Sequence, residues 1–166
     1  EKVTAEMNDM LCAPFSEKEI SDALFQIGPL KAPGKDGFPA RFYQRNWAVV
    51  KGEIIAAVMD FFLMGVMPEG VNDTAIVLIP KVQFPKELKD FWPISLCNVI
   101  YKIVSKCLGN CLHPILSALI SENQSAFIPG RLITDNSIIA FECIDYIQSV
   151  GDNSPACCAY KLDLCK

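Results

Sequence analysis

Apolar side chains recur at helical intervals in the first part of the chain. A capping-box sequence, Ser16 to Glu19, precedes a helix that is predicted to end at Gly28-Pro29. A second helical region is predicted from about Pro39 to Met64, with Gly65 as its C-terminal cap. The expected buried faces of these two helices are Ile20, Ala23, Leu24 and Ile27, and Ile54, Ile55, Val58, Phe61 and Phe62.

The middle of the chain predicts a β-hairpin. Thr74 to Pro80 is short, rich in β-branched residues and almost wholly apolar, which favours a buried strand. Residues 93–97 are its expected antiparallel partner. The loop between the two strands is basic, because it carries Lys81, Lys86 and Lys89.

Three helices and a strand are expected in the rest of the chain. Asn98 is predicted to cap a helix that runs to about Leu112, and Pro114 to begin a short helix. Thr134 or Asp135 caps the third helix. Its expected buried face is Ile138, Phe141, Ile144 and Ile147. Apolar and polar positions then alternate from Cys158 to Cys165, which is typical of a strand.

The chain is acidic overall, but one segment is basic. Its 15 basic and 19 acidic side chains give a net charge of −4, which is no general sign of nucleic-acid binding. Residues 28–51 hold five basic side chains against one acidic: Lys31, Lys35, Arg41, Arg45 and Lys51 against Asp36. The segment includes a turn-rich loop from Lys31 to Gly37. A basic local surface is therefore expected on an acidic protein.

Composition excludes several classes of protein. With 51% hydrophobic residues in 166, the chain is neither a disordered tail nor a low-complexity linker. The eight cysteines are read as free thiols in a reducing compartment, without a disulfide-linked partner. The longest apolar run, Ile54 to Met67, falls short of the roughly 20 residues of a membrane span. We expect a soluble protein of the nucleus or cytoplasm, with no signal peptide and no membrane partner.

Common catalytic and metal motifs do not account for the chain. The single histidine, His113, lies out of phase with Cys107 and Cys111 on a helix, so a zinc site is not expected. Asp163 lies between Leu162 and Leu164 on the alternating strand. It is either a solvent-facing residue of that strand or an oxygen ligand for Mg²⁺.

Five segments in order resemble the reverse transcriptase domain of plant LINE-type (non-LTR) retrotransposons. They are KAPGKDGFPARFYQ, LIPK, DFWPISLCNVIYKIVSK, LISENQSAFIPGRLITDN and AYKLDLCK, and the likeness begins at Leu11. It implies an α+β right-hand polymerase fold, mostly helical with a fingers hairpin. Residues 1–15 would be a lead-in, 16–155 the fingers subdomain, and 156–166 the first strand of the palm.

The resemblance also implies chemistry. The parent enzyme is an RNA-directed DNA polymerase that uses an RNA template, a DNA primer, dNTP and two Mg²⁺ ions. Asp163 corresponds to its first catalytic carboxylate and metal ligand, and the carbonyl of Leu164 to a second ligand. We expect this fragment of a transposable element to be inactive alone and not to bind Mg²⁺ stably. The second catalytic pair of aspartates is absent from the 166 residues.

Five residues are candidates for nucleotide or template contacts through the same likeness. Lys81, Lys102 and Arg131 would contact phosphates, although each is otherwise a solvated surface charge. Gln124 and Phe127 would line the template groove, although Phe127 is equally suited to a core.

The sequence departs from the family at three positions. Trp92 and Cys111 stand where the family has arginine, and Cys165 stands where it usually has serine. Indole lacks the charge and the fork of a guanidinium, which bears on triphosphate binding. Single-base changes explain both losses of arginine, so a decaying copy of the element is one hypothesis. The alternative functions are a non-enzymatic nucleic-acid-binding remnant and a functionless pseudogene product.

Overall fold

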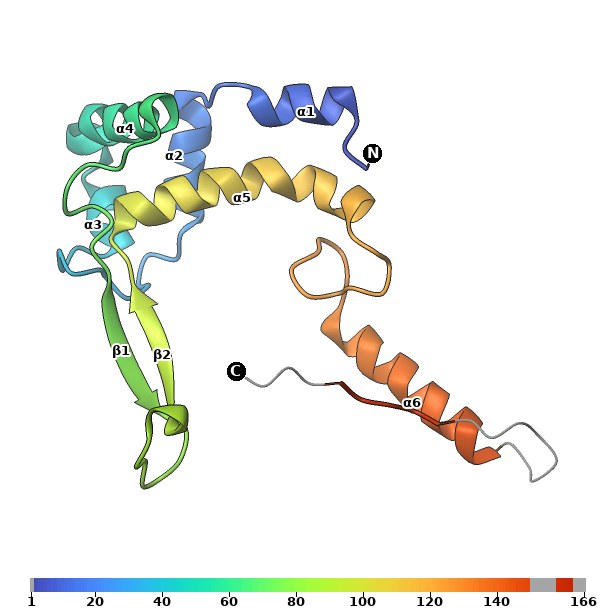
Figure 1. Cartoon of the computed structure of the whole chain (residues 1–166). Coiled ribbons are helices and arrows are strands. Elements are labelled where there is room, and N and C mark those ends of the chain that lie inside the picture. Colours follow the sequence, from blue (N-terminus) through green and yellow to red (C-terminus); the bar gives the residue numbers. More distant parts are fainter. Residues whose placement is uncertain (1, 150–157, 163–166) are drawn as a thin grey trace. The chain divides into compact units, whose positions relative to one another are not determined.

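The computed structural model describes residues 2–149 and 158–162. In chain order the elements are α1 (Ala5–Cys12), α2 (Glu17–Gln26), α3 (Ala40–Arg45), α4 (Trp47–Met64), β1 (Ala75–Pro80), the 3-10 turn η1 (Leu88–Asp90), β2 (Phe91–Leu96), α5 (Val99–Leu119) and α6 (Ile133–Ser149) (Figure 1). The chain divides into two compact units, residues 4–112 and residues 1–3 with 113–166. The combination of helices with one hairpin is α+β, and the polymerase fold and subdomain limits remain predictions.

The core of the first unit is made by α2, α3, α4 and the beginning of α5. Ile20 and Leu24 are fully buried, as the helical spacing predicted. The capping box that begins α2 is confirmed, because the Glu19 amide donates to Ser16 Oγ and the Ser16 amide donates to Glu19 Oε2. The buried cluster consists of Ile20, Ala23, Leu24, Ala40, Tyr43, Ile54, Ile55, Val58, Val99, Ile103, Val104 and Cys107.

The helical region predicted over 39–64 is divided at Asn46 into α3 and α4. The Asn46 side chain donates to the carbonyl of Phe42 at 2.8 Å, which satisfies a carbonyl at the end of α3. Gly65 has a φ of 70° and ends α4 in the left-handed conformation, so its predicted role as cap is confirmed. The N-terminal lead-in contains α1, which Thr4 caps by accepting from the Met7 amide.

The predicted hairpin is confirmed, but its burial is not. β1 and β2 pair antiparallel, with Ala75 opposite Leu96 at one end and Pro80 opposite Phe91 at the other. They extend away from the helices of the same unit as a two-stranded ribbon (Figure 1). Ile76, which was predicted to be buried, is 67% exposed. The prediction of a buried strand was wrong, because within the described residues no second layer covers the two-stranded sheet.

Helix α5 corrects two predictions. It continues through Pro114 to Leu119 instead of ending near Leu112. A proline removes one backbone hydrogen bond, but it does not end a helix whose neighbouring residues keep helical dihedrals. Asn98 precedes the helix as expected, yet its side chain bonds to two other segments rather than to the first turn of α5.

The C-terminal predictions are partly correct. Helix α6 forms, but it begins at Ile133, so Thr134 and Asp135 lie in its first turn. Its expected buried face is exposed, with Phe141 at 73%, because no described element covers it. Residues 158–162 are not assigned to a strand. Residues 163–165 of the predicted strand lie outside the described part of the chain.

Candidate nucleic-acid interface

The basic loop Lys31 to Gly37 lies against the beginning of α5. A Cβ atom placed on Gly34 would come 2.6 Å from Cα of Asn98 and still closer to its amide nitrogen and Oδ1. Real Cβ contacts are not this short, so the fit requires glycine at position 34. Two of the segments that carry the resemblance, KAPGKDG and DFWPISLCN, therefore meet backbone to backbone.

The Asn98 side chain joins three segments of the first unit. It is 6% exposed, and its Oδ1 accepts from the Asp36 amide at 3.3 Å. Its Nδ2 donates to the carbonyls of Gly70 and Val71 at 3.0 and 3.3 Å. The buried amide is thus fully used between the basic loop and the segment that precedes β1, which holds the base of the hairpin to the loop.

Lysine side chains reinforce the same junction. Lys102 Nζ donates to the carbonyl of Ala32 at 2.6 Å, so one candidate for phosphate contact binds the basic loop in this structure. Lys35 forms an ion pair with Asp73 at 3.0 Å, and both side chains are exposed. An exposed pair of this kind contributes little stability. The phosphate contact predicted for Lys102 stays a prediction.

Asp36 is exposed, but both of its carboxylate oxygens accept hydrogen bonds from nearby residues. Its Oδ1 accepts from the Phe38 amide at 3.1 Å, and its Oδ2 accepts from the Tyr43 hydroxyl at 3.4 Å. Burial raises the pKa of Tyr43 to about 12, and the charge and hydrogen bond of Asp36 act in the same direction. Both oxygens of the only acidic side chain of residues 28–51 therefore accept hydrogen bonds from the same unit, whereas all five basic side chains of the segment are exposed.

The side of the hairpin carries Lys81 and Trp92. Lys81 Nζ donates to the carbonyl of Lys89 at 2.8 Å and lies 6.0 Å from the centroid of the Trp92 ring. Trp92 is 58% exposed and lies opposite Ile79. The ring thus gives the Lys81 ammonium an aromatic neighbour. The predicted contact between Lys81 and phosphate stays a prediction.

The acidic side chains at the tip of the hairpin are engaged locally. Asp90 Oδ2 accepts from the amides of Lys86 and Glu87 at 2.9 and 3.1 Å, and these bonds lower the pKa of Asp90. Glu87 pairs with Lys89 at 2.8 Å. Lys86 is exposed. The tip consequently presents a cation outward while its carboxylates shape the turn.

Arg131 organises the loop that follows α5 in the second unit. One terminal nitrogen of its guanidinium donates to the carbonyls of Ser121 and Gln124, and the other donates to those of Ser117 and Ile120. These four carbonyls lie at or just beyond the C-terminal end of α5, where helix carbonyls lack partners within the helix. A phosphate contact by Arg131 stays a prediction, and it would compete with this cap.

Gln124 and Phe127 lie in the same loop. The Gln124 side chain makes a long hydrogen bond, 3.4 Å, to the carbonyl of Ala126. Phe127 has a φ of 64° and is 97% exposed, so the alternative of a core residue was wrong. A left-handed backbone is unfavourable for a bulky side chain. The neighbouring Ser125 is buried and donates to Asn136 at 2.9 Å, which helps to hold the turn.

The predicted catalytic residues, Asp163 and Leu164, lie outside the described residues. Among the residues that are described, no group of three or more His, Cys, Asp or Glu side chains is placed to hold a metal ion. Burial raises the pKa of the Cys107 thiol to about 11, so this thiol stays protonated near neutral pH. The binding of magnesium stays a prediction.

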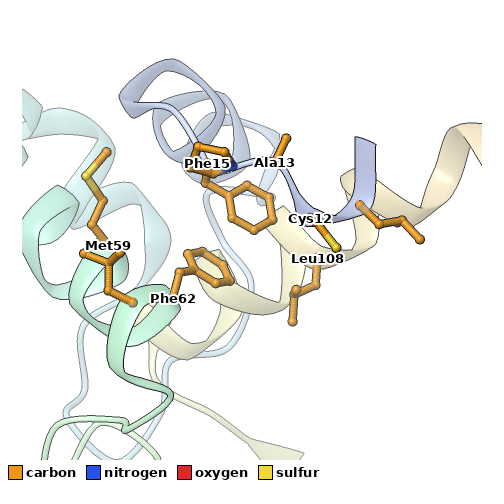
Figure 2. A pocket seen from close by; sticks show the side chains of 9 residues that line it. Cys12, Ala13, Phe15, Met59, Phe62 and Leu108 are labelled. Atoms are coloured by element: carbon orange, nitrogen blue, oxygen red, sulfur yellow. The ribbon is translucent and has the colours of Figure 1, made fainter. Parts of the chain in front are cut away.

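An apolar pocket of about 630 Å³ lies elsewhere in the first unit (Figure 2). The rings of Phe15 and Phe62 stack across it with centroids 4.2 Å apart. The lining is Leu11, Cys12, Ala13, Pro14, Phe15, Met59, Phe62, Leu63 and Leu108. These side chains carry no charge and include one thiol, so the pocket is unsuited to a polyanion. None of the lining residues belongs to the basic loop.

The structure also bears on the expectations of free cysteines and of no membrane-spanning segment. Six cysteines lie among the described residues, and all are free thiols. None of the helices in the described ranges is long and apolar enough to cross a membrane.

Comparison with known proteins shows a similarity to a transposon protein. Over 149 residues, 90% of this chain, the sequence is 28% identical to the transposon TX1 uncharacterized 149 kDa protein of Xenopus laevis. The chain is similar to a transposon protein. It spans 11% of the length of that relative. No family model matches the chain. A transposon-related origin is therefore supported, whereas a plant origin and a reverse transcriptase domain are not tested by this match.

Sequence reasoning missed the residues that assemble the junction. Gly34 was interpreted only as a turn residue and Asn98 only as a helix cap. The sequence does carry a partial signal, since both residues lie within the family-like segments. Their mutual contact depends on the packing of α5 against the loop, which no local pattern encodes.

Proposed function

We propose that this chain is the fingers region and first palm strand of an RNA-directed DNA polymerase encoded by a non-LTR retrotransposon. One observation carries most weight: separate family-like segments contact one another through residues of the segments themselves. Gly34 lies against Asn98, and Lys102 donates to Ala32. The similarity to a transposon protein over 90% of the chain supports the same assignment.

The proposal gives each region a task. The basic loop and the hairpin would hold template and incoming nucleotide, since cations are the expected donors to phosphates. Asp163 would share two Mg²⁺ ions with a second pair of aspartates, which activate the primer hydroxyl and stabilise the leaving pyrophosphate. One carboxylate cannot hold two metals. We therefore expect residues 1–166 alone to extend no primer.

The test uses the longest product of the gene that contains these residues. With an RNA template, a DNA primer and Mg²⁺, we expect incorporation of labelled dNTP that is lost in Asp163→Ala. Glu142→Ala, which changes an exposed carboxylate on α6, is the control and should retain incorporation. Synthesis that survives Asp163→Ala, or no synthesis on RNA by a product that binds the hybrid, would overturn the proposal. Binding without synthesis would instead favour a non-enzymatic remnant.

A further inference from the structure

The exposed surface of α3 combines aromatic and basic side chains. Residues of a helix are about 100° apart around its axis, so Arg41, Phe42 and Arg45 fall within about 100° on one face. All three are exposed. Phe38, two residues before the start of α3, packs against Phe42 with ring centroids 4.6 Å apart and the rings tilted by 39°. We call Phe38, Arg41, Phe42 and Arg45 the aromatic–arginine surface.

The opposite face of α3 is firmly anchored. Ala40 and Tyr43 belong to the buried core. Gln44 donates to the carbonyls of Leu24 and Ile27 at 3.0 and 2.9 Å, which caps the end of α2. The Tyr43 hydroxyl bonds to Asp36. The aromatic–arginine surface is therefore presented by a rigid helix rather than by a loop.

Within the part of the chain that the structure describes, the side chains of Arg41 and Arg45 have no polar partner. In the described ranges, 2–149 and 158–162, the guanidinium groups of Arg41 and Arg45 form no ion pair or side-chain hydrogen bond. The acid nearest to Arg41 in sequence, Asp36, accepts hydrogen bonds from the Phe38 amide and the Tyr43 hydroxyl. Phe38 and Phe42 are 45% and 39% exposed, although each ring is large and apolar. Free cations beside exposed rings complement a ligand that carries both negative charge and flat apolar faces.

We propose that the aromatic–arginine surface binds single-stranded nucleic acid, with Phe38 and Phe42 stacking on unpaired bases and Arg41 and Arg45 contacting the adjacent phosphates. Aromatic side chains and cations are the two components by which proteins hold single strands without reading their sequence. The inference rests on the proposed function only in its choice of a nucleic-acid ligand. It does not require the chain to catalyse synthesis.

The experiment measures binding of the full chain to a fluorescently labelled 12-nucleotide oligouridylate by anisotropy at several salt concentrations. Phe38→Leu with Phe42→Leu keeps apolar bulk but removes the rings, and we expect it to weaken binding about tenfold or more at an unchanged salt slope. Arg41→Gln with Arg45→Gln should reduce the salt slope by about 1.4, because two phosphate contacts are lost.

Matched controls lie on neighbouring helices. Phe25→Leu changes a ring that is 52% exposed on α2, and Lys18→Gln removes an exposed cation from the same helix. Both should bind as the unmodified chain does. Phe38→Tyr with Phe42→Tyr restores the rings and should restore binding. Melting temperatures show whether a variant has lost its fold. If the leucine variant has, the tyrosine variant and the arginine pair decide whether the aromatic–arginine surface binds the oligonucleotide.

Three outcomes would overturn the inference. The leucine variant, folded, could bind oligouridylate as tightly as the unmodified chain. The arginine pair could leave the salt slope unchanged. Light scattering could instead show that the surface joins two copies of the chain, which separate in the leucine variant. A failure of synthesis with ring-dependent binding intact would reject the polymerase proposal but not this site, and the reverse result would reject the site alone.

Discussion

Gly34 and Asn98 touch so closely that position 34 has no room for a side chain. The contact joins the basic loop to the residue that precedes α5. Because Asn98 is buried and bonded on both sides of its amide, it cannot move aside without breaking other contacts. The arrangement of the loop, the hairpin base and α5 therefore depends on this pair.

Gly34→Ala should destabilise the protein by about 1–3 kcal/mol, the usual range for forcing extra volume into a packed site. The measurement is the free energy of unfolding in urea. Gly109→Ala on α5 is the matched control, since a Cβ there meets nothing within 4 Å. That change should be neutral or stabilising by up to about 1 kcal/mol, because alanine favours helix. Equal stability of both variants would contradict the contact.

Asn98→Ala should cost about 1–3 kcal/mol, because it leaves the Asp36 amide and the carbonyls of Gly70 and Val71 without the Asn98 side chain as their partner. Hydrogen exchange of the Asp36 amide should accelerate as well. Asn110→Ala changes a half-buried asparagine on the same helix and serves as the comparison. An Asp36 amide that remains protected in Asn98→Ala would show that the side chain does not hold the loop.

Tyr43 should make the free energy of unfolding depend on pH, and its raised pKa fixes the sign of that dependence. Below about pH 10 the tyrosine keeps its proton in the folded and the unfolded chain, so its contribution is fully present. Between pH 10 and about 12 only the unfolded chain ionises there, and the free energy of unfolding should fall. Absorbance at the tyrosinate band should show one tyrosine that titrates late and disappears in Tyr43→Phe.

A second variant separates the causes of that shift. Asp36→Asn removes the nearby charge while burial persists, so the late titration should move toward the ordinary value without reaching it. A late titration that is unchanged in Asp36→Asn would mean that the Asp36 contact is absent in solution. A late titration that survives Tyr43→Phe would assign it to another tyrosine.

Arg131→Lys should loosen the end of α5 although it keeps the positive charge. A lysine ammonium is a point donor and cannot reach four carbonyls as the planar guanidinium does. We expect faster hydrogen exchange at the amides that end α5 and begin the following loop, by about tenfold or more if one or two charged hydrogen bonds are lost. Arg45→Lys, at an exposed arginine, should leave exchange in this loop unchanged. Unaltered exchange in Arg131→Lys would contradict the cap.

Sequence patterns predicted those features that depend on residues a few positions apart. The capping box at Ser16, the apolar face of α2 and the cap at Gly65 are confirmed because neighbouring residues supply all the partners they need. The hairpin was also predicted, from two apolar runs on either side of a basic loop, and it is confirmed. The predictions for the strand burial and for the buried face of α6 were wrong, because burial requires a second element that the pattern of one segment does not name.

The sequence by itself determined α2 and the hairpin, which faces of α2 and α4 are apolar, and that residues 28–51 are basic. These properties depend on side chains a few positions apart. Only the tertiary structure decided that Asn98 joins three segments instead of capping a helix, and that Arg131 donates to the end of α5. It also decided that Asp36 bonds to Phe38 and Tyr43, while the side chains of Arg41 and Arg45 have no partner among the described residues. Each of these depends on which polar groups meet once distant segments pack, because a buried hydrogen-bonding group must find its partner wherever the fold brings one.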